Sequence, residues 1–254
     1  MGMGGAESTA STRRAVVAGA VREAAGLPSL VLGASYLGFG SVVHQSGLDV
    51  WHGLVSTLTA WALPGQIAAI ELYATGASLA VIALAVALTN ARLFPMTVSL
   101  MPRLRHPGLP RWRMYLYAHL VAVTGWAFAM RRAPALPVEH RAAYFVAFAG
   151  TIWAASLVCT VVGFLLAGSV PAPVALGLVF LNPIYFMLVF AADARGAARI
   201  LSLVLGAALG PPLHLLSPDW GLMVTGLVAG SLAFAAGHIG AGRGRNRGGE
   251  RGHR

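Results

Sequence analysis

The sequence predicts an all-α integral membrane protein, a bundle of about eight transmembrane helices of which some are broken. Its 254 residues are 57% hydrophobic and only 10% charged, whereas about 25% charged residues are usual in soluble domains. Apolar stretches follow one another from residue 27 to residue 240. The few polar residues inside these stretches lie beside proline or glycine, which interrupt helices. Because hydrocarbon offers no partner to freed backbone groups, such positions must face protein or a wet cavity.

Each apolar stretch has about the 20 residues that a membrane crossing needs. The predicted spans are 27–45, 51–73, 77–101, 114–130, 142–168, 172–192, 197–216 and 219–239. They form one transmembrane domain at 26–240, with a cytoplasmic leader at 1–25 and a disordered tail at 241–254. The leader is not a removable signal peptide, because Arg22 and Glu23 end its apolar run after seven residues.

The arginines predict the orientation, because basic loop residues are retained in the cytoplasm. With eight crossings and the N-terminus inside, thirteen arginines fall in cytoplasmic segments and four in an outer loop at 102–113. Making one of the first three spans re-entrant leaves seven inside and ten outside. The arginine count therefore favours a multi-pass membrane protein with eight crossings and both termini cytoplasmic.

The composition argues against several other partners and chemistries. All 18 basic residues are arginines, and five follow the last span in a Gly/Arg-rich tail that suits anionic lipid headgroups better than nucleic acid. Cys159 is the only cysteine, so no disulfide, metal or redox pair is predicted. The aspartates Asp49, Asp193 and Asp219 fall at predicted span ends, which argues against an intramembrane protease. We therefore expect no catalytic residue, metal or cofactor.

Two spans contain predicted breaks. Pro64, Gly65 and Gln66 lie in the middle of the second span, and Asn182 and Pro183 lie in the sixth, 119 residues further along the chain. Paired broken helices are typical of transporter binding sites, because half-helix ends offer unpaired N–H and C=O groups to a substrate. The alternative is a simple bend in each helix.

The third span contains Arg92, with Asn90 two residues earlier. A guanidinium at this depth costs at least about 2.5–3.5 kcal/mol and must be satisfied. An antiparallel second span would bring Ser56, Thr57 and Thr59 near it. Arg92 is then either a carboxylate clamp or gate, or a structural group bonded to helix-end carbonyls.

His119 and His214 also fall within predicted spans. Each is either a proton relay or a hydrogen-bonded histidine between helices. The predicted substrate-binding or gating residues are Pro64, Gly65, Gln66, Asn90, Arg92, Asn182 and Pro183.

The second and third spans carry a resemblance to a known family. The segments that carry it are Gly38-Phe39-Gly40, Gly47-Leu48, Gln66-Ile67-Ala68-Ala69, Gly76-Ala77-Ser78-Leu79 and Thr89-Asn90-Ala91-Arg92. In this order and spacing they resemble the AzlC family, the large subunit of bacterial branched-chain amino-acid exporters. Leu93 replaces the histidine of the family pattern, and Ala34 to Tyr36 replace its Pro-Phe-Gly.

The resemblance implies a protein of the bacterial plasma membrane that exports branched-chain amino acids or analogues. It also implies a small AzlD-type membrane subunit as partner and an ion gradient as the driving force. Two alternatives stay open from the residues alone. One is a structural or assembly subunit of a membrane complex, and the other is a transporter of a different small organic solute.

Overall fold

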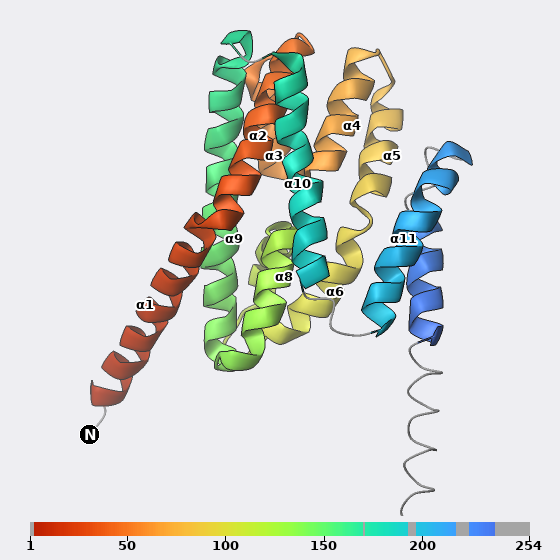
Figure 1. Ribbon diagram of the computed structural model, residues 1–254. Helices are drawn as coiled ribbons and strands as arrows, with labels where there is room; N and C mark the ends of the chain where they lie inside the picture. Colours follow the sequence, from red (N-terminus) through yellow and green to blue (C-terminus); the bar gives the residue numbers. More distant parts are fainter. Residues whose placement is uncertain (1–2, 170, 193–196, 217–223, 237–254) are drawn as a thin grey trace, which may run out of the picture. The chain divides into compact units, whose positions relative to one another are not determined.

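The computed structural model describes residues 3–169, 171–192, 197–216 and 224–236. Throughout this part of the chain the regular structure is helical, as predicted (Figure 1). The chain divides into two compact units, Met1–Phe186 and Met187–Arg254. Each unit is described by itself.

The first unit contains most of the helices. They are α1 (Met3–Ala25), α2 (Leu27–Gln45), α3 (Val50–Ala60), α4 (Leu63–Ala74), α5 (Leu79–Asn90), α6 (Leu93–Leu104), α7 (Arg111–His119), α8 (Val123–Arg132), η1 (Ala133–Ala135), α9 (Val138–Leu165), η2 (Ala167–Ser169) and α10 (Ala172–Ala192), whose last residues belong to the second unit. The second unit contains α11 (Ala197–Leu216) and a helical segment at Val224–Ala236.

Within the described residues, two helices are long and apolar enough to cross a membrane, α2 and α9. The pair α5 and α6 counts as a third if it forms one span, although it is bent by 53°. The predicted span at 77–101 is thus present, but broken at Ala91 and Arg92.

The helices α2 and α9 pack closely through glycine. A Cβ on Gly40 would meet the backbone of Thr160, and a Cβ on Gly163 would meet the backbone of Leu37. Such small residues let helix backbones approach in a membrane, where packing rather than hydrophobic burial drives association. This pair forms the framework against which the broken helices lie.

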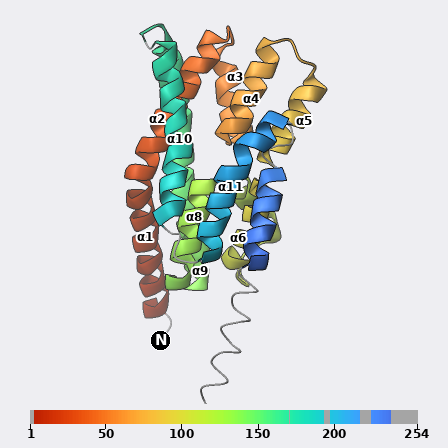
Figure 2. The same ribbon diagram turned by 45° about the vertical axis from the view of Figure 1, so that its right-hand side comes forward.

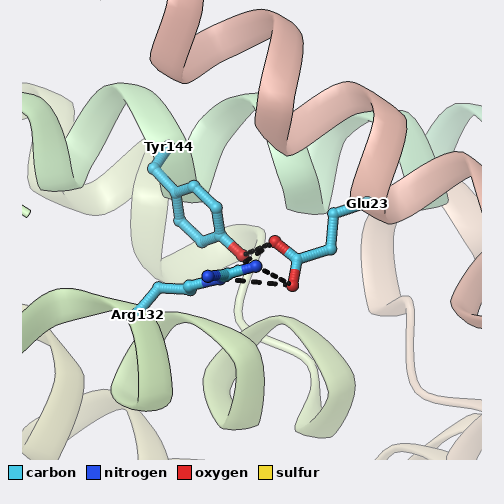
Figure 3. A network of polar contacts seen from close by, with 3 residues as sticks. All are labelled: Glu23, Arg132 and Tyr144. Atoms are coloured by element: carbon cyan, nitrogen blue, oxygen red, sulfur yellow. Dashed lines mark hydrogen bonds and ion pairs between the residues drawn. The ribbon is translucent and has the colours of Figure 1, made fainter. Parts of the chain in front are cut away.

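The segment expected to be a leader forms α1, which packs on α9. Ala20 and Ala24 are fully buried there. Glu23 accepts a hydrogen bond of 2.8 Å from the Tyr144 hydroxyl, and its carboxylate pairs with Arg132 at 2.9 Å (Figure 3). This network joins α1 to the end of α8 and the first half of α9.

The helices α3 and α4 form a hairpin that begins and ends at the same end of the first unit (Figures 1 and 2). The rings of His52 and Tyr73 lie 5.9 Å apart, although 21 positions separate them in the sequence. Deeper in the hairpin, Gln66 is hydrogen-bonded to Ser56. We call Val50–Ala74 the first hairpin, with its tip at Trp61 and Ala62.

The helices α7 and α8 form a second hairpin, Arg111–Arg132, with its tip at Leu120 to Ala122. The residues Arg113 and Tyr117 of α7 share a pocket with the start of α9. The residue Phe128 of α8 stacks on Phe148, and Arg132 lies beside Tyr144. The helix α7 is therefore parallel to α9, and α8 is antiparallel to it.

The structure does not confirm the eight expected crossings at these two segments. The predicted spans 51–73 and 114–130 each return to the end at which they started, and they enter from opposite ends of the unit. A hairpin of two short helices can have the same length as one straight span, so length does not distinguish them.

The second hairpin also changes the distribution of charge. The loop expected outside, 102–113, lies at the same end as the 131–141 connection and the second half of α1. We call this the arginine-rich end. Its arginines are Arg13, Arg14, Arg22, Arg103, Arg105, Arg111, Arg113, Arg131, Arg132 and Arg141. The connections at the opposite end, 46–49, 75–78 and 166–171, have none in the sequence.

The segment Gly76-Ala77-Ser78-Leu79, one of those that carry the family resemblance, forms a turn that requires glycine. Gly76 has a φ of +76°, a left-handed conformation that suits glycine. The N–H groups of Gly76 and Ala77 bond back to Tyr73 and Leu72, which closes α4 with a Schellman turn. The Ser78 hydroxyl then accepts a bond from the Val81 N–H at the start of α5. The motif thus makes the tight connection between α4 and α5.

The expected second break, at Asn182 and Pro183, is wrong. The helix α10 continues through Pro183. One proline removes one backbone bond, which a membrane helix can tolerate. The Asn182 side chain lies outside those that the structure describes.

Candidate functional site

The broken end of α3 exposes backbone carbonyl groups that two side chains satisfy. The Trp153 indole N–H donates to the Thr57 carbonyl at 3.3 Å, and His119 Nε2 lies 2.8 Å from the Leu58 carbonyl. Since a carbonyl only accepts, Nε2 carries the proton. His119 is therefore the hydrogen-bonded histidine of the two expectations. His214 lies exposed in α11.

Gln66 fastens the first hairpin to α2. It is 1% exposed. The Tyr36 hydroxyl donates to its Oε1 at 2.9 Å, while its Nε2 donates to Ser56 Oγ and Thr57 Oγ1, both at 3.0 Å. Ser56 and Thr57 thus bond to Gln66 and not to Arg92 as expected. Thr59 bonds to its own helix at Val55.

Replacing Gln66 with alanine should lower the stability of the protein by about 1–3 kcal/mol, because the buried Tyr36 hydroxyl loses its acceptor and the hydroxyls of Ser56 and Thr57 each lose a donor. Gln45→Ala is the matched control, since Gln45 is exposed and bonds only to Ser41. The measurement is thermal unfolding of both purified variants in detergent. Equal melting temperatures would show that the Gln66 bonds do not hold the hairpin.

The break between α5 and α6 meets the first hairpin at Gly65. A Cβ on Gly65 would lie 2.6 Å from Asn90 Oδ1, so only glycine leaves room for this amide. Asn90 Oδ1 is buried and has no hydrogen-bond partner among the described residues. The predicted residues Gly65 and Asn90 are therefore adjacent, with a polar acceptor available between them.

The second hairpin contributes an equivalent tip. Thr124 is 2% exposed, and its hydroxyl has no hydrogen-bond partner within the described part of the chain. The residues preceding α4 and α8 are both extended, with φ of −146° at Ala62 and −122° at Ala122. The two tips thus have similar local backbone.

A small pocket joins the three breaks, with a cavity volume of about 30 Å³. It is lined by Leu32 and Tyr36 of α2, Trp61 to Pro64 of the first tip, Arg92 and Leu93 of the α5–α6 break, and Ala122 to Thr124 of the second tip. Of the predicted residues, Pro64 and Arg92 line it, whereas Gly65, Gln66 and Asn90 lie directly behind. Pro183 is not part of this lining.

The pocket offers hydrogen-bond donors to an anion. Gln66 and Trp126 make the first backward bonds of their helices, to Ala62 and Ala122. The N–H groups before them therefore have no helical acceptor, and the positive ends of α4 and α8 meet at the pocket. Arg92 is exposed and forms no hydrogen bond or ion pair with any residue that the structure describes. The three groups together can bind an anion such as a carboxylate.

The sequence analysis missed the second tip, although a signal for it exists. Ala122 follows Ala62 by 60 residues, and Gly125 follows Gly65 by the same interval. The interval expected from Pro64 and Pro183 is 119 residues. The shorter interval relates two hairpins that enter from opposite ends, which is the arrangement of inverted repeats in transporters.

No curated protein and no solved structure matches the chain. The family described as AzlC protein matches residues 29–170. This segment runs from the start of α2 to the end of η2 and contains both hairpins and every residue of the pocket. As the match covers more than half of the 254 residues, the chain belongs to the AzlC family.

Proposed function

We propose that this chain exports branched-chain amino acids or close analogues, as the large subunit of a secondary transporter. Membership in the AzlC family supports a role in membrane transport. The observation that carries the proposal is the pocket itself. An amino-acid carboxylate fits Arg92 and the two helix N-termini, because a guanidinium donates two parallel hydrogen bonds to it. The apolar side chain then lies against Leu32, Leu93 and Val123.

Binding requires the hairpin tips to separate. The pocket volume of about 30 Å³ is far below the roughly 300–1,000 Å³ of ligand pockets. Since the hairpins enter from opposite ends, withdrawal of one tip opens the pocket to one side while the other tip stays closed. Alternating withdrawal of the two tips would give alternating access.

Both departures from the family pattern fall on the pocket lining, at Tyr36 and Leu93. Leucine in place of histidine removes an imidazole and adds apolar surface. We therefore propose that the preferred side chain differs from that of relatives with the histidine, and that a proton does not pass through this position.

A structural subunit remains the second candidate. It is favoured by the exposed α5, which has no buried residue and offers a face for a small AzlD-type partner. Co-purification of this chain with a tagged partner tests the pairing.

The experiment that tests export is efflux of preloaded labelled valine, leucine and methionine. We expect efflux from cells that contain this chain and its partner, and only background efflux when either is removed. Efflux that persists without this chain, or that needs only the partner, would favour the structural role.

The arginine-rich end should face the cytoplasm, because basic loop residues are retained there. In a Cys159→Ala background, Gly108→Cys should react with an impermeant maleimide only after the cells are permeabilised. A cysteine at Ala77, in an arginine-free connection, should react in intact cells. The reverse pattern would contradict this orientation, and labelling of both in intact cells would contradict the second hairpin.

A further inference from the structure

A second and larger pocket lies at the arginine-rich end, with a volume of about 510 Å³. We call it the α1–α9 pocket. It is lined by Arg13 and Val17 of α1, by His106, Gly108 and Leu109 of the connection before α7, by Arg113 and Tyr117 of α7, and by residues of α9 between Glu139 and Ala147. It shares no lining residue with the pocket at the hairpin tips.

The outer part of this pocket is basic. Arg13 and Arg113 come from different helices, and neither forms an ion pair among the described residues. His106 adds a third nitrogen-bearing side chain, and Glu139 is the one acidic residue of the lining. The balance of charge favours an anion.

A buried polar group points to a ligand as well. His140 is 5% exposed, lies in the lining, and has no hydrogen-bond partner for Nδ1 among the residues described. A buried polar atom without a partner costs about 1–3 kcal/mol. A ligand oxygen in the pocket would satisfy it.

The inner part of the pocket is apolar. Along α9 the lining passes from Glu139 and His140 to Ala143, Val146 and Ala147, and Val17 faces it from α1. At 1.5 Å per residue this stretch of α9 is about 12 Å long. The pocket is therefore charged at the end of the bundle and apolar toward its middle, which matches an amphiphile with an anionic head.

We propose that the α1–α9 pocket binds a phosphate-bearing anion, and that its lining fits an anionic phospholipid. The phosphate lies between Arg13, Arg113 and His140. The part of an acyl chain nearest the headgroup lies along Val17 and the alanines of α9. Basic pockets between helices on the cytoplasmic side bind headgroups in this way. The bound lipid would fasten α1 to α7 and α9.

The test measures thermal stabilisation of the purified full chain in detergent. Three additives are compared, namely dioleoyl phosphatidylglycerol, dioleoyl phosphatidylcholine and inorganic phosphate. The double variant Arg13→Ala/Arg113→Ala removes the proposed contacts. Arg14→Ala/Arg111→Ala is the matched control, because neither residue lines the pocket.

We expect phosphatidylglycerol to stabilise the wild-type chain and the control at lower concentration than phosphatidylcholine does. The double variant should need about five- to tenfold more lipid for each arginine lost. Ala147→Leu, which narrows the apolar part, should weaken lipid binding and leave any binding of inorganic phosphate unchanged.

Stabilisation by inorganic phosphate that equals that of the lipid, and that Ala147→Leu leaves intact, would support the anion site and assign it to a soluble phosphate. Equal responses to the two lipids would overturn the proposal. So would equal losses in the double variant and its control.

Discussion

Replacing Arg92 with alanine should weaken amino-acid binding by about ten- to a hundredfold. The guanidinium is the only charged side chain in the lining of the pocket at the hairpin tips. Losing one charge-assisted hydrogen-bonded contact costs about 1.5–3 kcal/mol. Arg92→Lys should keep the charge but lose the two-pronged geometry, so its affinity should fall between those of wild type and Arg92→Ala.

The measurement combines substrate affinity with melting temperature, on this chain purified with its partner. Arg103→Ala is the control, because Arg103 is exposed near the end of α6 and outside the pocket. If Arg92 only stabilises helix ends, Arg92→Ala should melt earlier and bind as tightly as the wild type. That result would refute the carboxylate clamp and leave the fold unchanged.

Replacing Gly163 with alanine should destabilise the protein by about 1–3 kcal/mol, the usual cost of overpacking. Its Cβ would meet the backbone of Leu37, which cannot rotate away as a side chain can. The helices α2 and α9 would have to separate, and Tyr36 and Trp153, which position the first hairpin, would move with them. We expect transport to fall together with the melting temperature.

Gly150→Ala provides the comparison within the same helix. A Cβ there meets nothing within 4 Å, and alanine favours helix more than glycine by about 1 kcal/mol. Gly150→Ala should therefore match or exceed the wild-type melting temperature. A loss as large as that of Gly163→Ala would mean that glycine in α9 serves helix flexibility rather than close packing.

The sequence predicted the first break because Pro64 and Gly65 are strong helix breakers, and the interruption indeed lies just before them, at Trp61 and Ala62. It did not predict the direction of the chain after the break. Hydropathy measures how apolar a segment is, and a segment that returns can be as apolar as one that crosses. The contacts that decide it, such as His52 with Tyr73, come from tertiary packing.

The second tip was harder to predict, since Leu120 to Ala122 contain neither proline nor glycine. A contact distant in the sequence lies beside this break, where the His119 side chain bonds to the carbonyl of Leu58. Conversely, Pro183 predicted a break that α10 does not show. Arg92 lines the pocket at the hairpin tips, but its expected neighbours Ser56 and Thr57 bond to Gln66 instead.

The second hairpin has a consequence for how the protein is made. Its helices carry Arg111, Arg113, Arg131 and Arg132, and the pair is not among the described segments apolar enough to cross a membrane. A translocon releases a segment into lipid only when the segment is apolar enough by itself. The partners that shelter α7 and α8 include Phe148 and Trp153, which are synthesised later. We therefore expect residues 111–132 to stay at the membrane surface at first and to insert into the bilayer only after α9 has been inserted.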